Sequence, residues 1–158
     1  MDHYHLAQVN IGRICASLED PVMAGFVNRL DEINALAESS PGFVWRLHTE
    51  EGNATYLRPF DDDRMLMNMS VWESVETLYE YVYRTVHVEL LRHAWFEKFE
   101  GAYTTLWWIP AGHLPSIEEA KDRLTWLDAY GPTRFAFSFK SVFAPHPESF
   151  EANRICPP

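Results

Sequence analysis

The stretch from Met65 to Phe99 carries the densest set of polar and aromatic side chains in the chain. His87 is the best candidate for a general acid or base, because histidine exchanges protons near neutral pH. Asn68 could support developing negative charge. Arg46, from an earlier segment, could bind a carboxylate or an enolate. These three residues are the predicted catalytic groups.

Seven further side chains are predicted to bind a substrate. Large aromatic rings offer apolar faces for stacking, and Tyr and Trp add one polar atom each. Neutral amides suit a wet cavity as well as open solvent. The predicted substrate-binding residues are Asn10, Trp72, Tyr79, Tyr83, Trp107, Trp108 and His113.

Each candidate also has a purely structural interpretation, which the sequence leaves open. His87 could be a packed histidine at a helix edge, and the partner of Asn68 could be backbone. Arg46 would be a solvated surface charge if it points outward. His113 lies in a turn where it could hold backbone instead of lining a pocket mouth. Tyr83 could belong to the core with its hydroxyl at the rim.

Several kinds of site are not expected. His87 and His93 are six residues apart, which places them on different faces of a helix, so no metal site is predicted. The acidic run 61–63 lacks calcium-loop spacing and reads as a solvated loop. No local signature of a Ser–His–acid or Cys–His nucleophile is present. No Gly-rich phosphate loop is present either, so we expect no nucleotide cofactor.

The composition narrows the class of protein. The 158 residues suggest one domain with its own core, and a formal net charge of -10 disfavours nucleic acid and anionic membranes as partners. No apolar run is long enough to span a bilayer, and no signal peptide is evident. The isolated Cys15 and Cys156 fit a reducing compartment, so we expect a cytoplasmic protein.

Periodicity predicts five strands and three helices. Caps are expected at Asp20, with Pro21 at the first helical position, at Ser74, and at Ser116 in a capping box with Glu119. The second helix should run to about Phe99. The predicted strands are 5–14, 43–48, 65–72, 103–109 and 135–143.

Neighbouring residues of a strand point to opposite faces, and this sorts the side chains. Asn68, Ser70 and Trp72 should share one face of the sheet, and Trp107 and Trp108 should lie on opposite faces. Phe43, Trp45 and Leu47 are expected together on one face. On the second helix the expected buried stripe is Leu78, Tyr79, Val82, Tyr83, Val86, Leu90 and Ala94.

The order β-α-β-β-α-β predicts an α+β, ferredoxin-like split βαβ domain with an additional C-terminal helix and strand. The single domain spans 1–158, with a core of about 5–144 and an irregular tail, 145–158. The sheet face opposite the helices needs cover, so we predict a homodimer, a dimeric α+β barrel.

Three segments carry a resemblance: NMSVWES before the helix with His87, LWWIPAGHLPSIEEAKDRL, and YGPTRFAFSF. The chain resembles the antibiotic biosynthesis monooxygenase-like superfamily of dimeric α+β barrels, and within it the uncharacterised bacterial family DUF3291. The resemblance implies a pocket between sheet and helices. It matches Asn68 and Trp72 to the pocket-facing Asn and Trp of cofactor-free oxygenases. It matches Asn10, Trp72 and His87 to the site of haem-degrading members, although His87 lies further along the chain after Trp72 than that pattern expects.

These observations lead to one main functional hypothesis and two alternatives. The main one is a cofactor-independent enzyme, of oxygenase, isomerase or cyclase type, acting on a hydrophobic aromatic or polyketide-like molecule. No cofactor is expected. The alternatives are a non-enzymatic protein that binds a ligand such as haem, and a dimeric domain whose aromatic residues all serve core and interface.

Overall fold

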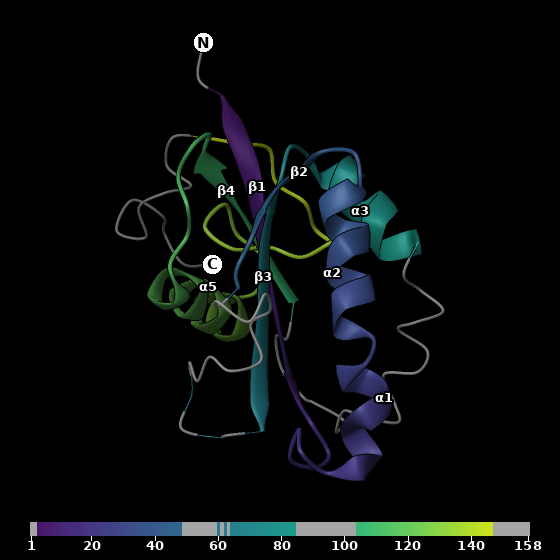
Figure 1. The fold of residues 1–158 in the computed structure, drawn as a ribbon. Helices are drawn as coiled ribbons and strands as arrows, with labels where there is room; N and C mark the ends of the chain where they lie inside the picture. The colour runs from purple at the N-terminus through teal and green to yellow at the C-terminus, as the bar shows by residue number, and fades with distance from the viewer. Residues whose placement is uncertain (1–2, 49–59, 61, 63, 85–103, 147–158) are drawn as a thin grey trace.

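The computed structural model describes residues 3–48, 60, 62, 64–84 and 104–146. A single antiparallel sheet of four strands crosses the described part of the chain (Figure 1). Its strands lie in the order β2-β3-β1-β4, so β1 and β3 are central. The strands are β1 (Tyr4–Arg13), β2 (Phe43–Arg46), β3 (Met65–Trp72) and β4 (Thr104–Pro110).

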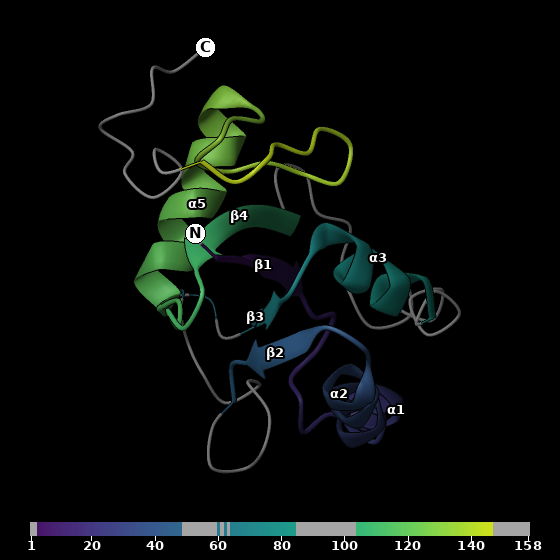
Figure 2. The same cartoon turned by 90° about the horizontal axis from the view of Figure 1, so that it is seen from above.

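The helices lie on both sides of this sheet. Figure 2 shows α2 and α3 on one side and α5 on the other. The chain passes from β1 through a short 3-10 turn and α1 into α2, and α3 follows β3. The bounds are Pro21–Met23 for the turn, α1 (Ala24–Val27), α2 (Leu30–Ser39), α3 (Val75–Arg84) and α5 (Ile117–Tyr130). This order confirms the α+β split βαβ fold, with α5 as the predicted extra helix.

All three predicted helix caps are present. Asp20 accepts a hydrogen bond from the Val22 backbone N–H at 3.0 Å, before the turn that begins at Pro21. Ser74 Oγ accepts from the Thr77 N–H at 3.2 Å, and Ser116 Oγ from the Glu119 N–H at 3.1 Å. Each bond satisfies a donor that the first helical turn leaves without a partner.

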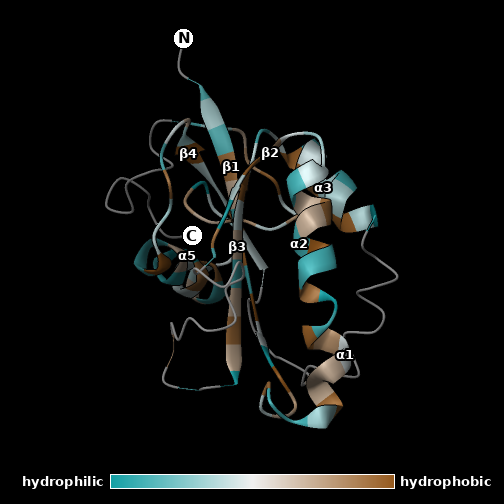
Figure 3. Cartoon of the chain, in the orientation of Figure 1, coloured by the Kyte–Doolittle hydropathy of each residue, from teal (hydrophilic) through white to brown (hydrophobic). Residues whose placement is uncertain are grey.

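The face of the sheet toward α5, here called the α5 face, holds the larger apolar cluster. Side chains from β1, β3 and β4 pack there against Ala120 and Leu124 of α5. Figure 3 shows α5 with both hydrophilic and hydrophobic residues, as expected for a helix with one buried side. The sheet residues of the cluster are Ala7, Val9, Ile11, Met67, Met69, Val71, Trp107 and Ile109.

The cover on the α5 face comes from the same chain. Met69 and Trp107 are 0% exposed and Val71 is 1% exposed. The sequence predicts that a second copy of the chain covers this face. An open apolar sheet face is therefore not found in the described part of the chain, and the homodimer stays a prediction.

The opposite face, here called the α2/α3 face, holds a second apolar cluster. Leu6, Trp72 and Trp108 lie in it together with Leu78 of α3. Trp107 and Trp108 thus occupy opposite faces, which confirms that prediction. Among the described residues no helix is long and apolar enough to cross a membrane.

Strand β2 departs from the predicted alternation. Phe43 pairs with Trp72, but Trp45 pairs with Val71, so β2 contains one more residue than β3 over this interval. Such a bulge reverses the facing of every later side chain. Phe43 packs with the α2/α3 cluster and Trp45 with the α5 cluster, so the prediction that they share a face is wrong.

The buried side of α3 was also predicted wrongly. Leu78 is 2% exposed, whereas Tyr79 is 58% and Tyr83 71% exposed. Tyr81, which the predicted stripe left out, stacks on Trp72 with 5.0 Å between ring centroids. The later part of the predicted helix, including Val86, Leu90 and Ala94, lies outside the described residues.

The segment from Thr133 to Phe143, here called the strap, replaces the predicted fifth strand. It forms two isolated bridges, Leu106 to Phe137 and Ser138 to Ser141, so the prediction of a regular strand is wrong. Figure 2 shows the strap passing from α5 around β4 toward α3. Phe137 exchanges backbone hydrogen bonds of 2.8 and 2.9 Å with Leu106 at the β4 edge.

Candidate functional site

Polar side chains occupy the middle of the α2/α3 face. Strand alternation brings Gln8 opposite Ser70, and Asn10 opposite Asn68, on β1 and β3. Thr104 of β4 lies opposite Asn10 on the other side of β1. Two adjacent rows of neutral polar groups therefore run across the middle of this face.

These side chains form a continuous chain of hydrogen bonds, here called the amide ladder. It consists of Gln8, Asn10, Asn68, Ser70 and Trp72. Gln8 Nε2 donates to Asn68 Oδ1 at 3.0 Å and to Ser70 Oγ at 2.8 Å. Asn10 Nδ2 donates to Gln8 Oε1 at 3.3 Å, and Trp72 Nε1 donates to Ser70 Oγ at 2.8 Å.

Burial changes sharply along the ladder. Gln8 is 6% and Ser70 5% exposed, while Asn68 is exposed. Asn68 nevertheless lies between Met67 and Met69, both buried, near the middle of a central strand. The ladder therefore leads from the packed interior to one polar side chain that solvent reaches.

Trp72 serves the ladder as an anchor. Its ring is 0% exposed, lies under Tyr81 and meets the edge of Phe43 at 5.5 Å. The indole N–H can only donate, and it fixes Ser70 Oγ as its acceptor. Protein side chains cover this ring, so in this conformation Trp72 has no free face on which a substrate could stack. Its role here is to hold Ser70 of the ladder in place.

Arg46 lies on the same face and is already paired. It is opposite Ser70 in the β2–β3 register. Its Nε lies 2.7 Å from Glu38 Oε1 of α2, and its side chain is 14% exposed. Arg46 thus points inward, as the anion-binding interpretation required, and Glu38 supplies its present anionic partner.

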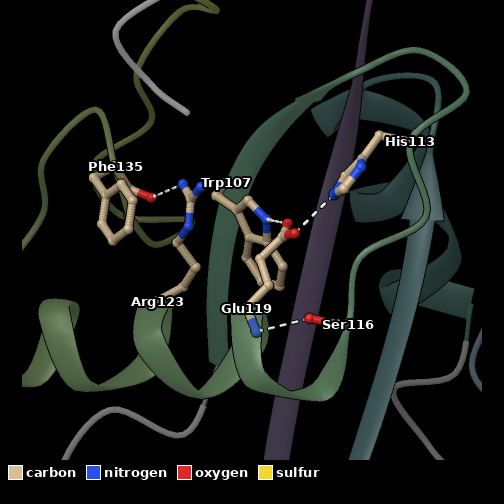
Figure 4. A network of polar contacts seen from close by, with 6 residues as sticks. All are labelled: Trp107, His113, Ser116, Glu119, Arg123 and Phe135. Atoms are coloured by element: carbon tan, nitrogen blue, oxygen red, sulfur yellow. Dashed lines mark hydrogen bonds and ion pairs between the residues drawn. The ribbon is translucent and has the colours of Figure 1, made fainter. Parts of the chain in front are cut away.

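Trp107 and His113 are held together on the other side of the sheet (Figure 4). Trp107 Nε1 donates to Glu119 Oε2 at 2.8 Å, and His113 Nε2 lies 2.7 Å from Glu119 Oε1. The Glu119 carboxylate thus ties the β4–α5 turn to the sheet. The structure does not bring Trp107 or His113 together with Asn68.

Arg123 continues this second network. Its Nη1 donates to the Phe135 carbonyl at 2.6 Å, and its guanidinium lies 3.7 Å from the centroid of the Phe135 ring. Burial lowers the pKa of Arg123 to about 10, because the charged form loses hydration, although the nearby Glu119 and Asp122 charges oppose the shift. The group remains charged at neutral pH and holds the start of the strap.

The remaining predicted residues are spread around the α2/α3 face. Trp108 lies in one row with Leu6 and donates its N–H to the Phe143 carbonyl at 2.7 Å. Tyr79 meets the edge of Phe139 at 5.9 Å between centroids. Tyr83 is largely exposed. His87 lies outside the described residues, so its predicted role stays a prediction.

Two ladder members, Gln8 and Ser70, were missing from the predicted site. The alternation of β1 and β3 already placed them on the correct face. The signal overlooked was their position opposite each other, since two buried neutral polar groups need each other as partners. Within the described residues no group of three His, Cys, Asp or Glu side chains could hold a metal ion.

Comparison with solved structures finds distant likenesses. Two structures of SnoaB, described as a cofactor-independent oxygenase from Streptomyces nogalater, are 18% and 19% identical to this chain. They match over 70% and 72% of this chain and 95% and 97% of theirs, each with a TM-score of 0.45. MupZ from Pseudomonas fluorescens is 10% identical over 92% of this chain and 91% of its own, with a TM-score of 0.44. These values carry no activity over to this chain.

The comparison with curated proteins gives no match. The match that decides the family covers most of the sequence. It spans residues 5–153 and includes Trp107 of β4, the β4–α5 turn with His113, and the strap. The chain belongs to DUF3291, a family described as a domain of unknown function.

Proposed function

We propose that this protein is a cofactor-independent enzyme that acts on a hydrophobic small molecule bound at the α2/α3 face. The observation that carries the proposal is the amide ladder, which ends in the exposed Asn68. Asn68 is exposed on a sheet face where its hydrogen-bonded neighbours Gln8 and Ser70 are buried, so a fixed amide meets solvent at the end of a packed polar network. A site that recognises one polar group of an apolar molecule needs this combination.

The chemistry that fits is support of an enolate. Removing a proton from carbon next to a carbonyl puts negative charge on the carbonyl oxygen. A fixed amide N–H beside that oxygen stabilises the charge more in the transition state than in the ground state. Isomerases return the proton at another carbon, cyclases use the enolate carbon as a nucleophile, and oxygenases pass its electrons to dioxygen. All three begin with this step.

Other groups would divide the remaining tasks. His87, from the sequence, is the candidate for moving the proton. Arg46 could add positive charge if the ligand's anionic group competed with Glu38 for the guanidinium. Apolar walls would come from the aromatic side chains of the same face, such as Tyr79 and Trp108.

Proton exchange tests the step shared by all three reaction types. The purified protein is incubated in D2O with 2-tetralone, a small cyclic ketone fused to a benzene ring, and deuterium uptake next to the carbonyl is followed by NMR. We expect the protein to accelerate uptake. We expect Asn68→Ala to lose about 10- to 100-fold of that acceleration, because one hydrogen bond to a charged group is removed.

Asn28→Ala is the matched control, because it makes the same chemical change at an exposed residue that follows α1 and does not belong to the ladder. Equal rates for Asn68→Ala and Asn28→Ala would exclude Asn68 from the reaction. No acceleration by the unchanged protein would contradict enolate chemistry on this substrate class. A Soret shift on haem titration would then favour the haem-binding alternative.

We further propose a homodimer for this enzyme, on the sequence argument alone. Light scattering behind a sizing column would measure its mass. A monomer at micromolar concentration would overturn the homodimer proposal and leave the enolate proposal unchanged.

A further inference from the structure

Gln8 is the centre of the amide ladder and bonds to three of its other members. Its side-chain NH2 group has two hydrogens, and the two short contacts of Nε2, to Asn68 and Ser70, use both. Its Oε1 accepts from Asn10. Gln8 is also only 6% exposed, so its amide makes its hydrogen bonds mainly to these side chains.

This arrangement determines which atom Asn68 presents. Asn68 Oδ1 is held by Gln8, which turns the Asn68 Nδ2 group away from the ladder. Asn68 is exposed, and no other side-chain contact of it is found among the described residues. The exposed end of the ladder is therefore a donor, with two N–H bonds available to a ligand.

We propose that Gln8 is a positioning residue that fixes the Asn68 amide with its N–H donors outward. The site then selects ligands that present an acceptor oxygen, either a ketone carbonyl or an enolate, over molecules of equal shape without one. This inference rests on the proposed function and goes further, because it names the group that sets the polarity of the site.

The variant Gln8→Glu tests this orientation, because Glu has nearly the same shape as Gln but accepts hydrogen bonds where the Gln8 NH2 group donates them. A carboxylate can only accept, so Asn68 must turn its Nδ2 group toward Glu and its Oδ1 outward to keep a hydrogen bond. Ser70 keeps a bond as well, since its hydroxyl can donate. The ladder remains satisfied, but its exposed end becomes an acceptor.

The probes are 2-acetylnaphthalene and 2-isopropenylnaphthalene, which match in shape and differ by a carbonyl oxygen in place of a methylene group. Affinity for each is measured by quenching of tryptophan fluorescence, and the ratio of the two dissociation constants is the readout. We expect the unchanged protein to favour the ketone. Gln8→Glu should reduce that preference about 5- to 10-fold, the equivalent of one hydrogen bond. A general loss of structure would weaken the binding of both probes equally and leave the ratio unchanged.

Thr104→Asp controls for the added charge. Thr104 lies on the same face opposite Asn10, is half-buried and contributes no bond to the ladder. This variant should keep the preference for the ketone. Gln8→Met removes the hydrogen bond to Asn68 without adding charge. It should give an intermediate ratio, because the Asn68 amide can then present either its Nδ2 or its Oδ1 to the ligand.

A Gln8→Glu ratio equal to that of Thr104→Asp would overturn the proposal, and so would failure of the unchanged protein to bind or to distinguish the two probes. The outcome is separable from the proposed function. If Gln8→Glu reduces the ketone preference as expected but the unchanged protein shows no deuterium exchange, the donor site would stand and the proposed enzyme activity would be contradicted. Exchange that Gln8→Glu leaves unchanged would keep the enzyme and remove the role of Gln8.

Discussion

The two faces of the sheet use polar groups in opposite ways. On the α5 face, the Glu119 carboxylate accepts a hydrogen bond from Trp107 and contacts His113. Arg123 donates to the Phe135 carbonyl, so these polar groups hold parts of the fold together. On the α2/α3 face, the amide ladder begins at the buried Trp72 and ends at the exposed Asn68. The first network, here called closed, bonds each of these groups to another part of the fold, even at the partly exposed His113. The second has an open end, because the Asn68 Nδ2 group bonds to no described residue.

This difference suggests a division between stability and function. Groups of the closed network should affect the free energy of unfolding when they are changed. The open end should affect ligand binding and leave stability nearly intact, because no buried partner loses its only bond. The Trp107 and Asn68 variants below test this division, and the Gly42 and Asp62 variants probe contacts outside both networks; they are given from the largest expected effect to the smallest.

Trp107→Ala should lower the free energy of unfolding by about 3–5 kcal/mol, since it removes a fully buried ring and the Glu119 bond. Denaturant unfolding measures the loss. Trp107→Phe keeps most of the volume and should cost about 1–2 kcal/mol, the cost of the lost hydrogen bond and the unfilled part of the site. A tolerated Trp107→Ala would mean that α5 does not depend on this contact.

Gly42→Ala should lower the free energy of unfolding by about 1–3 kcal/mol. Gly42 has φ 82°, and an added Cβ would lie 2.5 Å from the side chain of Thr77 at the start of α3. The close approach joins the segment after α2 to the start of α3, and so supports the α2/α3 face. Gly112→Ala is the control, because Gly112 also has positive φ, 94°, but open space around it. Equal losses in thermal melts would leave only backbone strain as the cause.

Asn68→Ala should change the free energy of unfolding by less than about 1 kcal/mol, because the removed amide is exposed. The same variant is expected to lose most of the deuterium exchange described above. Paired unfolding and exchange measurements on one preparation would check the division directly. A large loss of stability would make Asn68 a structural residue and erase the contrast between the faces.

Asp62 gives the smallest expected effect and lies on a loop outside both networks. Its hydrogen bond from Arg13, at 2.7 Å, is the main reason that the pKa of Asp62 is lowered. A carboxyl with a lowered pKa in the folded state stabilises it above its ordinary pKa, and this stability is lost as the pH falls through the folded value. Unfolding of Asp62→Asn should therefore show a slightly weaker pH dependence in the acid range than the unchanged chain. Both carboxylate and guanidinium are partly exposed, so added salt should shrink the difference.

Much of the fold was predictable because its signals are local. The caps at Asp20, Ser74 and Ser116 depend only on nearby side chains, and the opposite facing of Trp107 and Trp108 follows from strand geometry. The order of elements then gave the split βαβ topology. These features needed no knowledge of what packs where.

The misses have a common cause, since each depends on a partner distant in sequence. The alternation of β2 cannot reveal that an extra residue follows Phe43, because only the pairing with β3 shows it. The phenylalanines of the strap alternate like a strand, yet they are fixed by Arg123 and Trp108 from two faces. Alternation places Gln8 and Ser70 on the correct face, but it cannot show that their side chains bond to each other, because that depends on the pairing of β1 with β3.

The strap also has a consequence for the chain in crowded solution. A sheet in the order β2-β3-β1-β4 has two edges that could recruit a strand from another molecule. Phe137 occupies hydrogen-bonding groups of the β4 edge at Leu106, and β2 is only 4 residues long and bulged. The two edges are thus protected by different means, one by a covering segment and one by shortness and irregularity. Loss of the Arg123 or Trp108 anchors would uncover β4, and aggregation would then reveal the damage sooner than unfolding would.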